Sequence, residues 1–304
     1  MNGVAARVIF GGVRARARDF LSLTKPRVVS LIAFTAAVGA ALAALSHPVA
    51  PLAAALSLAG ITLVAASGAA FNCLVEKYRD ALMTRTRFRP LPDGRIGTAD
   101  AACFAALSGA AGLWLVAEFG GGAAAWLTAA TFLGYAVVYT LLLKRATPQN
   151  IVIGGAAGAM PPVLGWTAAA GELTYEPLLL FLIIFVWTPP HFWALALYRR
   201  DDYARAGLPM LPVTHGTSFT AAQILLYAVM LFAVSLLPFA AGMAGVLYLC
   251  AAVVLGGRFV RMAWRVRKTE AESECRRLFA FSITYLALLF AALFADAFVR
   301  AFAA

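Results

Sequence analysis

The sequence predicts an all-α protein, a membrane helix bundle that crosses the bilayer nine times. Of the 304 residues, 62% are hydrophobic and 13% are charged, and the mean hydropathy is +0.83. This composition is too apolar for a soluble globular protein. Apolar windows of about 20 residues, the length that crosses a hydrocarbon core, recur along the chain. Basic residues collect in alternate gaps between these windows.

The windows follow one another so closely that no sizeable soluble domain fits between them. In order they cover residues 28–46, 51–72, 99–118, 122–143, 150–170, 177–197, 218–238, 240–257 and 278–299. The seventh and eighth form one nearly continuous apolar stretch, interrupted by Pro238 and Gly242. Two spans are favoured there, because a single span would move the basic loop 258–277 to the wrong side. Small residues, such as those from Gly154 to Gly158, predict close helix packing.

The basic residues predict the orientation. Of 25 Lys and Arg residues, 24 lie in segments 1–27, 77–95, 144–145, 199–205 and 258–277. The positive-inside rule makes residues 1–27 a basic cytoplasmic N-terminal tail and places the C-terminus outside. Positive-inside flanking and anionic lipid explain the net charge of +11, so the bilayer is the expected partner and nucleic acid is not. The Ala- and Arg-rich composition favours a bacterial inner (plasma) membrane over the mitochondrial inner membrane.

An acidic cluster follows the second span. Asn72, Glu76 and Asp80 are spaced at i, i+4 and i+8, so on a continuing helix they project from one face. Two carboxylates and an amide oxygen suit Mg²⁺, which keeps waters and binds substrate phosphates as well. The alternative is an ordinary helix end on which the acids pair with neighbouring basic residues.

An arginine-rich loop comes next and favours the metal site over the ordinary helix end. Arg85, Arg87 and Arg89 precede Pro90, and guanidinium groups match phosphate geometry. Lys144 and the Lys25-Pro26-Arg27 segment lie at other gaps of the same predicted side. Each could reach a diphosphate or serve only as a topology signal.

A second polar segment lies between the sixth and seventh spans, where Asp201, Asp202 and Tyr203 follow two arginines. These acids could bind a second cation or complete the first site, and the alternative is a solvated loop with internal ion pairs. Within the sixth span, Pro189 and Pro190 precede His191. The prolines predict a broken helix that lines a cavity. His191 is a candidate to contact substrate or ligate iron, or else a packing histidine.

The polar cluster from Asn72 to Leu91 resembles the first signature of the membrane prenyltransferase superfamily typified by 4-hydroxybenzoate polyprenyltransferase. Within it, the chain resembles the protohaem IX farnesyltransferase (haem O synthase) family. Further matches run in the same order through residues 20–300: Leu23-Thr24-Lys25-Pro26-Arg27, Leu143 to Gly155, Pro161-Pro162, Gly165-Trp166, Pro190-His191-Phe192, Asp202-Tyr203 and Met210-Leu211-Pro212. Glu76 stands where many members have aspartate, which leaves the number of metal ions open.

The resemblance implies one prenyltransferase domain over residues 28–300, with a central cavity open to the cytoplasm. It implies transfer of the farnesyl group of farnesyl diphosphate to the vinyl group of haem b, with Mg²⁺ as cofactor and haem A synthase as a partner. The predicted metal ligands are Asn72, Glu76, Asp80, Asp201 and Asp202. Asn72, Glu76, Asp80 and Asp202 are the catalytic candidates; Arg27, Arg85, Arg89 and Lys144 are the diphosphate-binding candidates; His191, Tyr139 and Tyr203 are the substrate or haem candidates.

Two other functions compete with this one. A prenyltransferase of the same fold could act on a quinone precursor or chlorophyllide, and the acceptor assay distinguishes these. A small-molecule transporter should carry charges within its spans or internal repeats, whereas the strong charges here lie at span ends.

Overall fold

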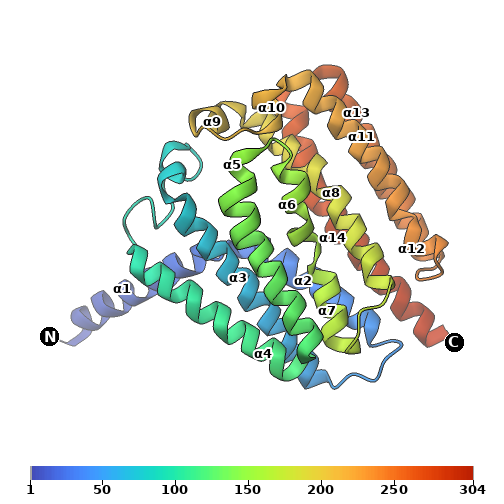
Figure 1. Ribbon diagram of the computed structural model, residues 1–304, viewed down its shortest axis with the longest axis horizontal. Coiled ribbons are helices and arrows are strands. Elements are labelled where there is room, and N and C mark those ends of the chain that lie inside the picture. Colours follow the sequence, from blue (N-terminus) through green and yellow to red (C-terminus); the bar gives the residue numbers. More distant parts are fainter. Residues whose placement is uncertain (1, 304) are drawn as a thin grey trace.

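The computed structural model describes the backbone of residues 2–303, excluding the side chains of residues 2–11, 13, 145 and 303. Arg7 of the predicted basic tail and Arg145 therefore lie outside the described side chains. The described chain is helical without a strand, and its helices stand side by side in a bundle (Figure 1). In chain order these are α1 (Asn2–Leu23), α2 (Pro26–Ala43), α3 (Pro51–Leu82), α4 (Thr98–Leu133), the π-helix η1 (Gly134–Leu143), α5 (Lys144–Ala146), α6 (Asn150–Ala159), α7 (Pro161–Ala170), α8 (Glu176–Tyr198), α9 (Arg200–Arg205), α10 (Leu211–Thr214), α11 (Gly216–Ser235), α12 (Leu237–Ala240), α13 (Val246–Thr269) and α14 (Glu272–Ala303).

Eight helical runs in the described residues are long and apolar enough to cross a membrane. The predicted spans 99–118 and 122–143 both fall within one run, Thr98–Leu143, which is 46 residues long. Gly121 interrupts that run with φ of 83° and ψ of 168°, values that glycine adopts readily. The predicted number of nine thus depends on counting the two halves of this run separately.

Contacts with α3 show that the chain reverses at Gly121. Before the reversal, Gly109 packs against Ser67 and Gly112 against Gly60, so the two helices are antiparallel. After it, Tyr135 packs against Gly68 and Thr140 accepts a hydrogen bond from Asn72, so η1 runs in the same direction as α3. The two halves of this run are therefore antiparallel to each other.

Of two other expectations about the spans, one is confirmed and one is wrong. The stretch 218–257 forms two spans, as predicted, because α12 ends before Gly242, whose φ of 73° turns the chain into α13. The predicted break at Pro189-Pro190 is wrong, since α8 continues through both prolines. Both are buried, and α8 packs against α6, α11 and α14, so tertiary packing keeps the helix continuous despite two missing N–H donors.

Close backbone packing confirms the expectation from the small residues. A methyl group on Gly39 would overlap the Pro162 carbonyl, and one on Gly165 would overlap the Ala36 carbonyl. Helices α2 and α7 therefore touch along their backbones, which is how small residues bring membrane helices together. Gly154 of the quoted run lies directly against the Tyr139 ring.

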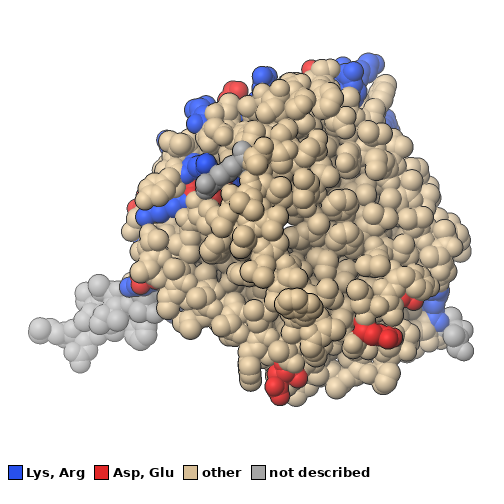
Figure 2. Space-filling model, viewed as in Figure 1, with Lys and Arg blue, Asp and Glu red and all other residues tan. Residues whose placement is uncertain are grey.

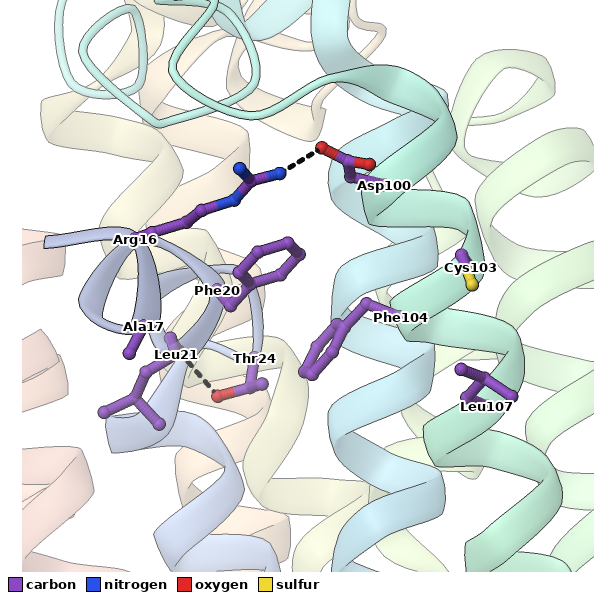
Figure 3. A pocket seen from close by; sticks show the side chains of 9 residues that line it. All are labelled: Arg16, Ala17, Phe20, Leu21, Thr24, Asp100, Cys103, Phe104 and Leu107. Atoms are coloured by element: carbon purple, nitrogen blue, oxygen red, sulfur yellow. Dashed lines mark hydrogen bonds and ion pairs between the residues drawn. The ribbon is translucent and has the colours of Figure 1, made fainter. Parts of the chain in front are cut away.

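Charge is distributed unevenly between the two ends of the bundle. On the face in Figure 2, most Lys and Arg residues lie toward the end that holds α9 and α10, and acidic residues dominate the opposite end. The predicted basic tail is helical up to Leu23. Its end packs beside α4, where Arg16 donates to Asp100 at 2.8 Å and Phe20 meets Phe104 (Figure 3).

Candidate functional site

The polar residues of α3 occupy one buried face, as their spacing predicted. Helix α3 continues to Leu82, and Asn72, Glu76 and Asp80 expose only 3%, 5% and 1% of their surface. Buried carboxylates are costly unless they are paired and hydrogen-bonded. Each of the three polar side chains in fact meets a cation or a polar partner from a different part of the chain.

Lys25 is the partner of Asn72. Its ammonium group donates to the Asn72 carbonyl oxygen at 2.6 Å, and burial lowers the pKa of Lys25. Lys25 has a φ of 52°, a left-handed conformation that is uncommon for a residue with a side chain. Arg27, the predicted diphosphate ligand of this segment, is exposed and forms no ion pair among the described residues. The structure thus brings Lys25, not Arg27, to the polar face.

Lys144 is the partner of Glu76. The two side chains form an ion pair, and Lys144 exposes 13% of its side chain. Lys144 directly follows η1, whose wider turn is a local departure from α-helix that is frequent at functional sites. Of the two readings for Lys144, the contact favours a role at the polar site over a topology signal alone.

Arg89 is the partner of Asp80, with 2.7 Å between Arg89 Nη1 and Asp80 Oδ2. Thr86 closes the turn between them by donating to the Asp80 carbonyl at 2.9 Å. Asp80 Oδ1 is buried and has no hydrogen-bond partner among the described residues. Arg85, which was also predicted to bind diphosphate, is exposed and forms no ion pair with a described residue.

The second polar segment joins the first through Asp202. Thr84, on the loop after α3, donates to Asp202 Oδ1 at 3.1 Å, and Arg205 and Arg199 flank the same carboxylate. Burial alone would raise the pKa of Asp202, but the hydrogen bonds from Thr84 and Arg205 outweigh it and hold the pKa below its ordinary value. Asp201 is exposed. Of the two acids, only Asp202 connects the two segments.

The carboxylates fit a hard cation, although they do not form one preassembled cage. Among the described residues no group of three or more His, Cys, Asp or Glu side chains lies close enough to hold a metal ion. Magnesium needs only one or two carboxylates when substrate phosphates complete its coordination. Asp80 Oδ1, which has no hydrogen-bond partner among the described residues, is free to bind a cation in this way. The five-residue metal set stays a prediction, with Asp201 the member least supported by its position.

Comparisons with known proteins identify the family. The model of the UbiA prenyltransferase family matches residues 32–294. The chain belongs to the UbiA prenyltransferase family. It is 57% identical over 289 residues to a protein of Azoarcus sp. (strain BH72) named protoheme IX farnesyltransferase, covering 95% of this chain and 97% of that one.

Solved structures show the same fold. A structure described as digeranylgeranylglyceryl phosphate synthase superposes with a TM-score of 0.76 at 18% identity, covering 93% of this chain and 99% of the other. A UbiA homologue from Archaeoglobus fulgidus bound to GPP and Mg²⁺ has a TM-score of 0.60 at 16% identity, covering 90% and 99%. The chain is thus an integral, multi-pass membrane prenyltransferase of the UbiA fold.

Of the three aromatic candidates, His191 and Tyr139 have packing partners of their own. His191 is buried, with Nδ1 2.6 Å from Ser282 Oγ, and stacks between Trp187 and Phe279 at 4.2 and 4.7 Å. This arrangement favours the packing reading of His191. Tyr139 stacks on Tyr135 at 5.6 Å. Tyr203 is half-buried on α9, where burial raises its pKa.

Sequence reasoning missed three contributors to this polar site: Thr84, Thr140 and Arg205. Thr84 and Arg205 stand within the motifs already singled out, beside residues with stronger charge or chelating character. Thr140 lies inside an apolar span, and nothing in the local sequence marks it.

The central cavity also stays a prediction, because the two surface grooves described in the structure lie elsewhere, between α1 and α4 (Figure 3) and between α13 and α14.

Proposed function

We propose that this protein transfers the farnesyl group of farnesyl diphosphate to the vinyl group of haem b, with addition of water, to give haem O and diphosphate. The observation that supports the reaction class is the buried row of Asn72, Glu76 and Asp80, each facing a cation or polar group from another segment. The names of the relatives at 57% identity support the choice of donor and acceptor.

The site contains the two kinds of side chain that a metal diphosphate needs, acids for the metal and basic groups for the phosphates. In the structure these acids and basic groups pair with one another. Its carboxylates and its basic side chains are Glu76, Asp80, Asp202, Lys25, Lys144, Arg89 and Arg205. The acids would hold Mg²⁺, and the basic side chains would contact the phosphate oxygens of the diphosphate. With both ligands bound, each buried acid and each buried basic side chain would again face an opposite charge.

The basic residues then stabilise departure of the diphosphate. As the allylic C–O bond breaks, its electron pair stays on the diphosphate, and Lys25, Lys144 and Arg89 face the growing negative charge. Bound Mg²⁺ supplies further positive charge at the phosphate oxygens. Before the substrate arrives, the ion pair with Asp80 keeps Arg89 at the site.

The remaining steps form the carbon–carbon bond and add water. The haem vinyl group gives its π electrons to the farnesyl cation, and water then adds to the resulting cation and loses a proton, leaving a hydroxyethylfarnesyl substituent. The apolar spans of the bundle hold the isoprenoid tail and keep water from the allylic cation until the new bond has formed. Tyr139, close to Lys144 in the chain, offers an aromatic face for that cation.

The cellular setting follows from the same proposal. A bacterial inner membrane with the N-terminus and the polar site on the cytoplasmic side agrees with the charge distribution. Residues 28–300 act as one prenyltransferase domain. Haem A synthase, which consumes haem O, is the proposed downstream partner.

One assay tests the proposal. Purified protein in lipid nanodiscs receives haem b, labelled farnesyl diphosphate and Mg²⁺, and the pigment is analysed by mass spectrometry. The expected product is haem b with one farnesyl group and one hydroxyl group added, absent when a chelator removes Mg²⁺. Conversion of a phenolic acid or of chlorophyllide, with haem b unchanged, would overturn the acceptor. Absence of any transfer, with all these acceptors offered, would reject the enzyme.

A further inference from the structure

A second basic site lies on the surface between α13 and α14, distinct from the prenyltransferase site. Arg258, Arg261 and Arg265 of α13 and Arg277 of α14 line a groove of about 850 Å³ together with apolar residues. We name it the arginine groove. It lies near the hairpin that joins the two helices, at the end of the bundle where the sequence concentrates its basic residues.

Helix geometry directs three of these arginines into the groove. Positions 258, 261 and 265 have the i, i+3, i+7 spacing that places side chains on one helix face. Their Cα atoms extend over about 10 Å along the axis, at about 1.5 Å per residue. The Arg258 guanidinium lies 4.6 Å from the centre of the Phe281 ring, so α14 holds it against the groove wall.

The positive charge of the groove is not neutralised within the protein. Arg277 pairs with Glu274 at 2.8 Å, the single acid of the lining. Arg258, Arg261 and Arg265 form no ion pair with any described residue. Basic residues nearby but outside the groove behave differently, since Arg267 meets Glu270 and Arg276 pairs with Glu272. Three adjacent unpaired guanidinium groups form a site for an anion.

The groove is amphipathic along the helix axis. Beyond the arginines, toward the middle of both helices, Val254, Gly257, Ala280 and Phe281 complete the lining, and Val254 is 70% exposed. A bound molecule therefore meets charge near the helix ends and apolar surface deeper in the membrane. A soluble phosphate uses only the first part, whereas a phospholipid uses both.

We propose that the arginine groove binds an anionic phospholipid with two phosphates, of the diphosphatidylglycerol kind. Its phosphates lie along Arg258, Arg261 and Arg265, whose extent of about 10 Å exceeds the reach of a single phosphate, and one acyl chain lies along Val254 and Phe281. The inference is independent of the prenyltransfer reaction, because no residue of the groove belongs to the polar site around α3.

Titration of delipidated protein with diphosphatidylglycerol, followed by native mass spectrometry, tests this site. The R261Q/R265Q variant should lower the affinity at least about tenfold, since each basic residue near a membrane surface contributes roughly 1 kcal/mol to binding anionic lipid. The matched control R267Q/K268Q removes the same charge from the last turn of the same helix without touching the groove lining. It should change the affinity less than twofold.

Several outcomes would overturn the proposal. Equal losses in the two variants would mean that the lipid responds to overall charge and not to the groove. Normal binding by R261Q/R265Q would exclude these arginines. Phosphatidylglycerol that binds as tightly as diphosphatidylglycerol would exclude the two-phosphate fit. The wild-type titration, with phosphatidylcholine as the uncharged reference, provides this last comparison even if a variant fails to fold.

Discussion

The polar site around α3 and the arginine groove both hold several basic residues at the same end of the bundle, yet they differ in burial and pairing. In the polar site Glu76 and Asp80 are buried and each meets a basic side chain from another segment. In the groove Arg261 and Arg265 are exposed, and neither forms an ion pair with a described residue. Paired buried charge suits a reaction that exchanges ions, and unpaired exposed charge suits a lasting anionic ligand.

This contrast predicts that loss of one buried acid has the largest effect. Asp80→Asn should lower kcat by about 100-fold or more, equal to about 2.7 kcal/mol, because it removes a carboxylate proposed to bind metal and the ion-pair partner of Arg89. The matched control is Asp93→Asn, which removes an exposed carboxylate paired with Arg95. Farnesyl transfer in nanodiscs measures both, and wild-type activity in Asp80→Asn would reject the assigned site.

The next largest effect separates two neighbouring basic residues. Lys25→Met should reduce kcat/KM about 10- to 100-fold, because the Lys25 ammonium reaches the polar face through Asn72 and its loss removes one charged contact to diphosphate. Arg27→Met should stay within twofold of wild type, since that side chain is exposed. Steady-state kinetics with varied farnesyl diphosphate distinguish them, and the reverse ranking would restore Arg27 as the ligand.

Replacement of His191 should affect stability and not haem binding. His191→Ala should leave the absorption spectrum of bound haem b unchanged, because the His191 ring is buried and packed between Trp187 and Phe279. The same change should lower the Tm by several degrees, since it removes a buried ring and leaves a cavity. A shifted haem spectrum in a variant that is otherwise folded would show that His191 ligates iron.

The sequence pattern was sufficient to predict the helical spans and one face of the site. It was not sufficient to predict which side chains from different helices and loops contact each other. Helix periodicity alone placed Asn72, Glu76 and Asp80 together. It could not choose between Lys25 and Arg27, because the left-handed backbone of Lys25 decides which side chain turns inward. Likewise, Pro189 and Pro190 carry a local signal for a break, but packing of α8 against its neighbours overrides it.

The smallest expected effect is on the pH dependence of stability, and it concerns Asp202. Its pKa is held below the ordinary value in the folded protein, so its contribution to stability is complete above the unfolded pKa of about 3.9 and is lost as pH falls through the folded value. Between pH 7 and pH 3, the Tm of the wild type in detergent should therefore fall by more than that of Asp202→Asn. Equal slopes for the two proteins would mean that the bonds from Thr84 and Arg205 add no stability to the ionised carboxylate.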